Sequence, residues 1–416
     1  MYNFKDVTVI RDLAKQWMEI ASSDRHLKMR KRFRDSNDLK IVRPPVLIDE
    51  IPWHEMNYEG ALDCICESED LRKIEYHLRK GLFREKYLKC DNFLEPFWIV
   101  EKAFTNTGNG FEIQEDCCIT DNNNDIVSHN YHDVLKDERA LEKYHDPIII
   151  PHPEEDARKV AFMQEILGDS MPVVLRGHNI YYSPWDKIAM MRGNDTILMD
   201  MYDNPEHLHK IIELFTRAMS IEMDQMNKYN LYDPKLINLH CTPNFITQPD
   251  GAELTEDGVY TSKNVWFRTM AQPFASVSPA MHDEFDVQYS IPLAKRCAYT
   301  YYGCCEPLHD RIHVIKQYPN LRKIGVSPWA NVWKSAEAIE GNFVLSRKPN
   351  PAYVASVVDT EVVRKEITET VQACQKFGCP VDITLKDIST VGYRPQNLIE
   401  WAKTVSDVLD EYYQAE

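Results

Sequence analysis

Apolar side chains recur every three or four residues near the start of the chain, as at Ile10 and Leu13. This spacing predicts an amphipathic helix over residues 7–22, and a similar pattern predicts a second helix over residues 69–87. Two later runs rich in β-branched and aromatic residues predict the strands of a small antiparallel insertion. The apolar stripe of the helices needs a larger partner to cover it, so we expect residues 1–150 to form an N-terminal helical extension with a small β insertion.

After Pro151, short apolar runs alternate with helical patterns. Strands are predicted over residues 172–177, 235–239, 299–302, 321–326, 341–346 and 381–385. Helices are predicted over residues 154–167, 184–191, 205–229, 284–296, 311–316, 360–377 and 395–413. A loop is expected over residues 249–258, from which the chain continues to Ser278. The alternation predicts a parallel sheet, and this many units in series favour a closed (β/α)8 TIM-type barrel over residues 151–416.

Polar side chains follow most of the predicted strands. In a barrel of this kind they converge on one rim, where the active site is built. The set consists of Arg176, His178, His240, Cys241, Cys304, Cys305, Glu306, His309, Trp329, Asn331, Arg347, Lys386 and Asp387. His282, at the start of a predicted helix, could reach the same rim or serve as a structural group.

The stretch from Tyr299 to Asp310 carries the densest chemistry in the chain. Its aromatic strand breaks at Gly303 and is followed at once by two cysteines, a glutamate and a histidine. A catalytic zinc ion needs about three ligands from cysteine, histidine and carboxylate, with one position left open. We expect Cys304 or Cys305, together with Glu306 and His240, to supply that set, since adjacent cysteines on a turn rarely both reach one ion; the alternative is that one cysteine only packs in the barrel.

Three further rim residues suggest substrate contacts. Asp387, next to Lys386, suits a general acid or a substrate anchor, although it could equally cap a helix. Arg176 and Arg347 suit an anionic substrate group through paired hydrogen bonds, and the alternative for each is a salt bridge within the fold.

Composition limits the kinds of partner that the protein can bind. The chain has 416 residues and a formal net charge of −17, from 48 basic and 65 acidic side chains. Such a surface repels phosphate backbones and anionic membranes, so we expect neither nucleic acid nor a membrane as partner. No apolar run approaches the ~18 residues of a membrane span, and the N-terminus lacks the apolar core of a signal peptide, so we expect a cytoplasmic protein. Eleven cysteines, an odd number with two adjacent pairs, favour reduced thiols.

Several short motifs resemble the uroporphyrinogen decarboxylase superfamily. Ser278-Pro279-Ala280-Met281 leads into Glu284-Phe285, and Gly341-Asn342 follows a turn that contains Pro328-Trp329. The resemblance covers roughly residue 172 to the C-terminus. It implies a (β/α)8 barrel of one of two branches, the uroporphyrinogen decarboxylases or the zinc-dependent methyltransferases that work with a corrinoid protein. The arginine-rich N-terminal motif of the decarboxylases is absent, which disfavours a substrate with eight carboxylates.

The methyltransferase branch carries a His-x-Cys motif at one strand and a further cysteine near the last strand. The matching stretch here is Tyr302-Gly303-Cys304, so Cys304 matches the family cysteine and Tyr302 replaces the histidine. Asp387 stands near the place of the second cysteine. The resemblance therefore implies either a zinc set that includes Glu306 and His240 or a site without zinc.

Our first hypothesis is the methyltransferase component of an anaerobic corrinoid-dependent demethylation system. Zinc would be its metal, a partner protein would supply the corrinoid, and the substrate would be a small methylated molecule. We assign catalysis to Glu306, Asp387 and His240. Substrate contacts are expected from Arg176, His178, Tyr302, Trp329, Asn331, Arg347, Lys386 and His282. The alternatives are a carbon–carbon lyase in which Asp387 or Glu306 protonates a carbanion, and a corrinoid or tetrapyrrole carrier; a homodimer stays open.

Overall fold

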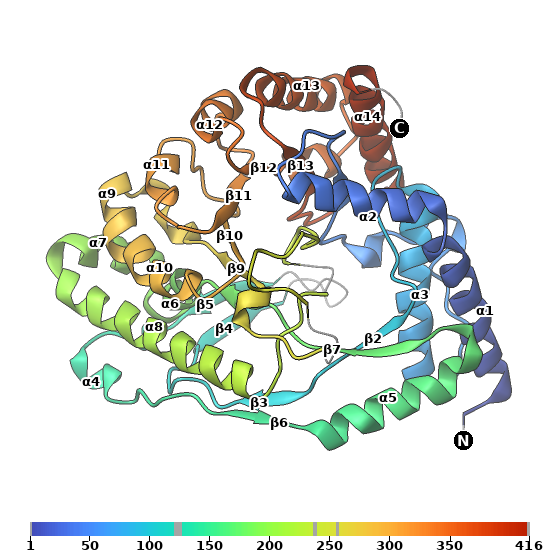
Figure 1. Cartoon of the computed structure of the whole chain (residues 1–416), viewed down its shortest axis with the longest axis horizontal. Helices are drawn as coiled ribbons and strands as arrows, with labels where there is room; N and C mark the ends of the chain where they lie inside the picture. The colour runs from blue at the N-terminus through green and yellow to red at the C-terminus, as the bar shows by residue number, and fades with distance from the viewer. Residues whose placement is uncertain (1, 120–126, 236–238, 255–257, 414–416) are drawn as a thin grey trace.

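The largest element of the protein is a parallel sheet that curls into a half-barrel (Figure 1). The computed structural model describes residues 2–119, 127–235, 239–254 and 258–413. The sheet has seven strands in the order β1 (Val46–Ile48), β13 (Val381–Leu385), β12 (Val344–Arg347), β11 (Leu321–Val326), β10 (Tyr299–Tyr302), β9 (Trp266–Thr269) and β8 (Ile180–Tyr182). Every neighbouring pair is parallel, which confirms the predicted parallel sheet.

The strands described do not form the predicted closed barrel. β1 pairs with β13, whereas β2 (Trp98–Glu101) pairs with β7 (Val173–Arg176) in a separate two-stranded parallel sheet. No ladder joins β1 to β2 within the described residues. Side chains from α1 (Phe4–Ala21) and α3 (Glu69–Tyr87) enter the space between these two strands instead. Of the predicted strand 235–239, residues 236–238 lie outside the described residues.

The sequence pattern missed strand β9, which lies between the predicted loop 249–258 and Ser278, where no element was predicted. Its four residues read Trp-Phe-Arg-Thr, and the charged Arg268 interrupts the apolar run on which the prediction depended. Strand β12 begins at Val344, three residues later than the predicted start at residue 341. The physical reason is that residues 340–342 form the turn that ends the preceding helix, with Glu340 and Gly341 at positive φ.

Helices cover the outer face of the sheet (Figure 1). The predicted ones correspond to α5 (Pro153–Leu167), α6 (Pro184–Arg192), α8 (Pro205–Lys228), α11 (Ile312–Ile315), α13 (Thr360–Phe377) and α14 (Pro395–Tyr412). The structure adds α2 (Asp24–Asn37), α7 (Asn194–Asp203) and α12 (Val332–Ile339). Gly378 ends α13 in the left-handed conformation, as predicted. The predicted helix 284–296 is divided into a π-helical turn (Asp283–Val287) and α10 (Gln288–Ala294), and the short α9 (Pro279–His282) precedes them.

The first 150 residues contribute to the sheet as well as to the helices. β1 is an edge strand of the seven-stranded sheet, and β3 (Phe104–Asn106) pairs with β6 (Ile149–Pro151). The small antiparallel insertion is present as a hairpin of β4 (Glu115–Cys118) and β5 (Ser128–Tyr131). Cys117 and Cys118 are both exposed on this hairpin.

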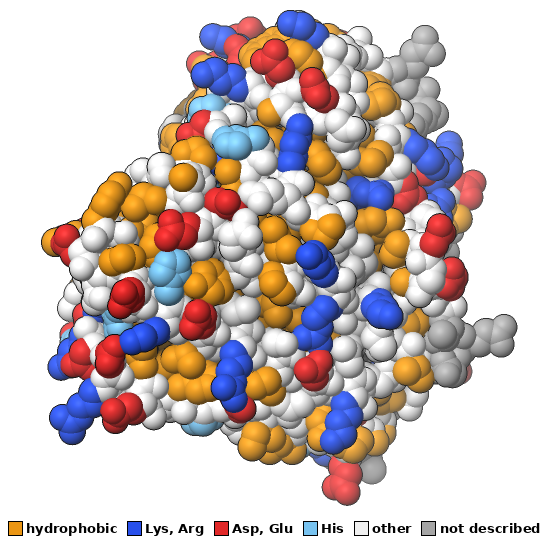
Figure 2. Space-filling model, turned by 60° about the vertical axis from the view of Figure 1, so that its left-hand side comes forward, with side chains coloured by type: hydrophobic (Ala, Val, Ile, Leu, Met, Phe, Trp, Pro, Cys, Tyr) orange, Lys and Arg blue, Asp and Glu red, His pale blue; other side chains and the backbone are white. Residues whose placement is uncertain are grey.

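The surface carries no sign of one dominant charge on the side shown in Figure 2. Basic side chains there are interspersed with acidic ones and with apolar side chains. No helix within the described residues is long and apolar enough to cross a membrane.

Candidate functional site

The curl of the sheet brings together the ends of two strands that are not neighbours. Cys304 and Cys305 follow β10, and Lys386 and Asp387 follow β13. The Lys386 ammonium lies 3.1 Å from the Cys304 sulfur, 3.5 Å from the Cys305 sulfur and 3.0 Å from an Asp387 carboxylate oxygen. Together with His240, which hydrogen-bonds to Cys304, these four residues are called the thiol cluster below. The predicted convergence of these rim residues therefore holds for this group.

Two glycines set the turn that presents Cys304. Gly303 has a φ of 94°, in the left-handed region that residues with a Cβ rarely adopt. A Cβ on Gly325 of β11 would lie 2.7 Å from the carbonyl carbon of Gly303. The chain can therefore leave β10 against β11 only because both positions lack a side chain.

The two adjacent cysteines differ in protonation. The Cys305 thiol lies 3.6 Å from the Cys304 sulfur and 3.1 Å from an Asp387 oxygen. The hydrogen bond from Cys305 lowers the pKa of Cys304 far below that of an ordinary thiol, and His240 lowers it further. The same contact, together with burial, raises the pKa of Cys305. These opposite shifts favour the thiolate at Cys304 and the protonated thiol at Cys305.

Below the thiol cluster, the inner face of the sheet is unusually cationic. Arg268, Lys323 and Lys348 are all essentially buried. Asp382 accepts hydrogen bonds from Lys323 at 2.5 Å and from the Ser346 hydroxyl at 2.6 Å. Burial opposes ionisation of Asp382, but the charge of Lys323 outweighs it and lowers the pKa of Asp382.

The remaining two of these cations face the ring of Tyr301. The Arg268 guanidinium lies 4.0 Å and the Lys348 ammonium 5.8 Å from the centre of that ring. Two nitrogens of Arg268 are buried without a hydrogen-bond partner. This excess of positive charge favours the Cys304 thiolate and an anionic ligand beside it.

Strained backbone surrounds the same place. Glu50, His240, Cys241 and Asp387 all have positive φ angles, of 51°, 45°, 64° and 56°. Non-glycine residues in this region cost free energy and tend to gather at functional sites. The Asp387 amide donates to Glu50 at 2.7 Å, and the Cys241 sulfur lies 3.6 Å from the other Glu50 oxygen. The four strained residues therefore belong to one constellation.

This constellation contains a set of side chains suited to a metal. Ligand atoms of Glu50, His240 and Cys241 all lie within 4.8 Å of one another. Imidazole, thiolate and carboxylate are the ligands that zinc takes in catalytic sites. Zinc fits this donor set, and His240 and the adjacent Cys304 thiolate connect it to the thiol cluster.

The predicted metal set is brought together only in part. His240 and Cys304 meet, but the single thiol hydrogen of Cys305 is shared between the Cys304 sulfur and an Asp387 oxygen. Glu306 is buried, and its carboxylate accepts from the backbone amides of Cys304 at 2.8 Å and Ala271 at 3.4 Å. Burial, with the nearby thiolate, raises the pKa of Glu306. Through these hydrogen bonds, the Glu306 carboxylate holds the turn that carries Cys304.

Tyr302 and His282 meet, but in the layer between sheet and helices. The Tyr302 hydroxyl donates to Asp286 at 2.6 Å and lies 2.5 Å from His282 Nε2. All three side chains are fully buried. Successive residues of a strand face opposite sides, so Tyr301 faces the cationic interior and Tyr302 faces away from it.

The other predicted rim residues make contacts of their own. Arg347 is buried and joins β12 to α13 through Glu366 at 2.8 Å. His178 Nε2 lies 2.7 Å from the Lys102 carbonyl oxygen. Arg176 lies 3.7 Å from Asp233 and 5.1 Å from the ring of Phe97. Their expected contact with substrate stays a prediction.

Two predicted residues lie on the solvent side of β11. Asn331 caps α12 by accepting from the Lys334 amide at 3.0 Å. Trp329 is 67% exposed.

Sequence reasoning missed Glu50 and Arg268. Glu50 follows β1, so the rule that polar residues after a strand are functional would have found it had β1 been counted as a barrel strand. Arg268 lies within β9, the strand that was not predicted. Lys348 directly follows β12 and is found by the same rule, whereas Lys323 and Asp382 carry no local signal, because a charged residue inside an apolar strand is usually exposed.

Comparison with known proteins adds little. No family model matches the chain, and no curated protein matches it. Among solved structures, the chain is similar to a methyltransferase from Methanosarcina mazei, with 14% sequence identity and a TM-score of 0.47. The alignment covers 92% of this chain and 98% of that one. A likeness of this degree assigns no function.

Proposed function

We propose that the protein is the methyltransferase component of a corrinoid-dependent methyl-transfer system. The observation that carries the proposal is the Cys304 thiolate beside Lys386, at the carboxyl end of a curled parallel sheet. In parallel α/β folds of this shape, chemistry is placed at that end. The superfamily resemblance of the sequence supports the same reaction class.

Each residue of the site would have its own role in methyl transfer. A zinc ion held by Glu50, His240 and Cys241 would act as a Lewis acid toward the substrate heteroatom or thiolate. Lys386 would hydrogen-bond to the heteroatom that loses the methyl group. Glu306 would keep the Cys304 turn in place, since it already binds the amide of that residue.

The reaction balances with a corrinoid as the methyl acceptor. The heteroatom–methyl bond breaks, the cobalt(I) of the corrinoid supplies the electron pair of the new cobalt–methyl bond, and the heteroatom gains a proton. Asp387, an exposed carboxylate that touches both Lys386 and Cys305, is suited to pass that proton from solvent. The reverse direction uses the same groups, with a thiol as the methyl acceptor.

Exposed apolar side chains support a protein partner at this rim. Trp329, Val357 and Tyr393 follow β11, β12 and β13, and they are 67%, 70% and 64% exposed. Aromatic and aliphatic side chains in such positions are typical of interfaces. We infer that a corrinoid protein docks over them.

Anaerobic incubation with free cob(I)alamin and a panel of methyl ethers, methylamines and methyl thioethers tests the proposal. The expected result is conversion of the cob(I)alamin spectrum to that of methylcobalamin, lost in Cys304→Ser. Cys297→Ser is the matched control, because Cys297 is a buried thiol before β10 whose one hydrogen-bond partner among the described residues is the Leu293 carbonyl. Release of CO₂ from an aromatic acid without methyl transfer would favour the lyase, and tight corrinoid binding without turnover the carrier.

A further inference from the structure

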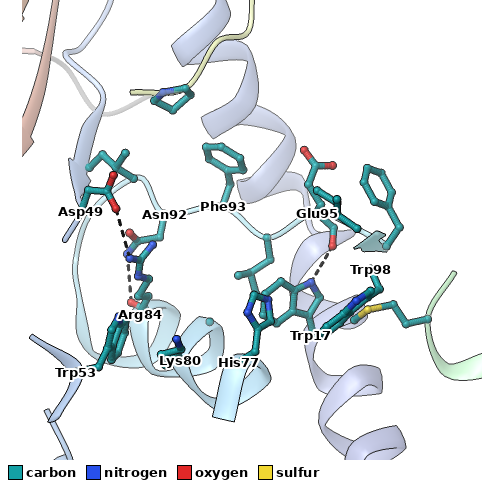
Figure 3. Close-up of a pocket in the computed structure, with 17 residues that line it drawn as sticks. Trp17, Asp49, Trp53, His77, Lys80, Arg84, Asn92, Phe93, Glu95 and Trp98 are labelled. Carbon is teal, nitrogen blue, oxygen red and sulfur yellow. Dashed lines mark hydrogen bonds and ion pairs between the residues drawn. The ribbon is translucent and has the colours of Figure 1, made fainter. Parts of the chain in front are cut away.

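A cavity lies where a closed barrel would join β1 to β2. Its volume is about 410 Å³, within the range of small-molecule sites. It is lined from both strands, by Leu47 of β1 and by Trp98 and Ile99 of β2, so it lies in the unpaired seam between them (Figure 3). We call it the seam pocket. None of the five thiol-cluster residues lines it.

Aromatic rings form much of the wall. Figure 3 shows Trp17, His77 and Trp98 grouped at one end and Trp53 at the other. His77 stacks on Trp17 with ring centres 5.8 Å apart and meets Trp98 edge-on at 4.9 Å. A Cβ on Gly81 would lie 2.1 Å from a ring atom of Trp17, so this glycine lets the ring lie against α3.

Two cations of α3 project into the seam pocket. Lys80 and Arg84 are one helical turn apart and lie 5.7 Å and 5.4 Å from the Trp53 ring centre. Among the described residues, no carboxylate lies within 4.0 Å of Lys80, and Arg84 has only Asp49, at 4.0 Å. Arg84 Nε is buried without a hydrogen-bond partner.

The other ionisable groups of the lining do not cancel this charge. Glu95 is already paired with Arg30. The ring of His77 is exposed, and an imidazole carries no negative charge in either protonation state, so it offers these cations no counter-charge. Two cations thus face one carboxylate, that of Asp49, in a cavity with aromatic walls.

We propose that the seam pocket binds a small aromatic carboxylate. Its ring would lie among the tryptophans, and its carboxylate would take the free hydrogen-bonding capacity of Lys80 and Arg84. A neutral aromatic would leave these cations without a counter-charge in a half-buried place. A compact anion without a ring would leave the aromatic walls unfilled. The inference stands on the cavity alone and does not depend on the proposed methyl transfer.

Titration of tryptophan fluorescence tests the proposal, because three of the lining residues are tryptophans. The probes are benzoate, benzyl alcohol, which has the ring without the charge, and acetate, which has the charge without the ring. Benzoate should give a saturable change and bind at least about tenfold more tightly than either comparator, the gain expected of a charged hydrogen bond.

Two variants locate the binding. Lys80→Gln and Arg84→Gln should each weaken benzoate about tenfold. Lys86→Gln, on the exposed side of the same helix, should leave binding unchanged. Lys80 is the less buried of the two cations, so its variant decides the matter if Arg84→Gln does not fold. Folding of each variant is checked by its thermal transition.

Three results would overturn the proposal. They are no saturable change with benzoate, equal affinity for benzyl alcohol, and unchanged benzoate affinity in folded Lys80→Gln. Because the readout is binding, absence of methyl transfer would leave it unaffected, and absence of binding would leave the methyltransferase proposal unaffected.

Discussion

The Lys386 ammonium lies 3.1 Å from the Cys304 sulfur, although two other strands separate β13 from β10 in the sheet. Only the curl of the sheet can bring these strand ends together. Burial disfavours the ammonium, but the Cys304 thiolate outweighs this and raises the pKa of Lys386. The two side chains therefore form an ion pair, in which the charge of each favours the charged form of the other.

The thiolate should persist below neutral pH. The pKa of Cys304 is lowered in the folded chain, so the charged form is lost only as the pH falls toward that lowered value. Its contribution to stability is complete above the ordinary thiol pKa and declines as the pH falls below it. The difference in ultraviolet thiolate absorbance between wild type and Cys304→Ser should be the same at about pH 8 and about pH 6.

The control for this measurement is Cys297→Ser. Burial raises the pKa of Cys297, so its removal should change no thiolate signal at either pH. Loss of the Cys304 difference between about pH 8 and about pH 6 would mean that the thiol cluster does not hold a thiolate.

Lys386→Met should separate charge from packing. Methionine keeps much of the apolar stem but removes the ammonium that faces both sulfurs. We expect the pKa of Cys304 to rise and methyl transfer to fall by at least about 100-fold, the usual size of such an effect. The matched control is Lys334→Met, an exposed position on α12. Full activity of folded Lys386→Met would remove Lys386 from the mechanism.

Strand ends were predictable, but the side that each residue faces was not. Cys304 and Lys386 could be placed at one rim because both follow short apolar runs. In a parallel sheet covered on both faces, consecutive residues are all apolar or aromatic, so alternation gives no signal. Tyr301 and Tyr302 look alike in sequence, yet one faces the cations and the other faces Asp286.

Whether the barrel closes could not be predicted from the sequence either. Local patterns indicate where strands begin and end, but the pairing of β1 with β2 depends on contacts between distant segments. Here the aromatic and cationic side chains of α1 and α3 line the cavity in that seam. Glu50 could not be identified for the same reason. Its strand, β1, lies in the predicted N-terminal extension, and only the pairing of β1 with β13 places the end of β1 at the rim.

Zinc content should distinguish two ligand sets. His129→Ala is the background, because Glu115, Cys117 and His129 form a second, exposed group of metal-type ligands. In that background we expect about one zinc per chain, lost in Cys241→Ser and retained in Cys305→Ser. Elemental analysis after gel filtration gives the answer. Loss of zinc in Cys305→Ser with retention in Cys241→Ser would restore the set predicted from sequence.

Tyr302→Phe should affect stability and spare activity. The change removes the hydroxyl that donates to Asp286 and contacts His282, and leaves both side chains buried with fewer partners. An unsatisfied buried polar group of this kind costs about 1–3 kcal/mol in the free energy of unfolding, which urea titration would measure. Because Tyr302 faces away from the cationic interior, methyl transfer by the folded variant should stay within about twofold of wild type, a barrier change well under 1 kcal/mol. A fall of more than about tenfold in activity without loss of stability would instead place this tyrosine in contact with substrate, as predicted from the sequence.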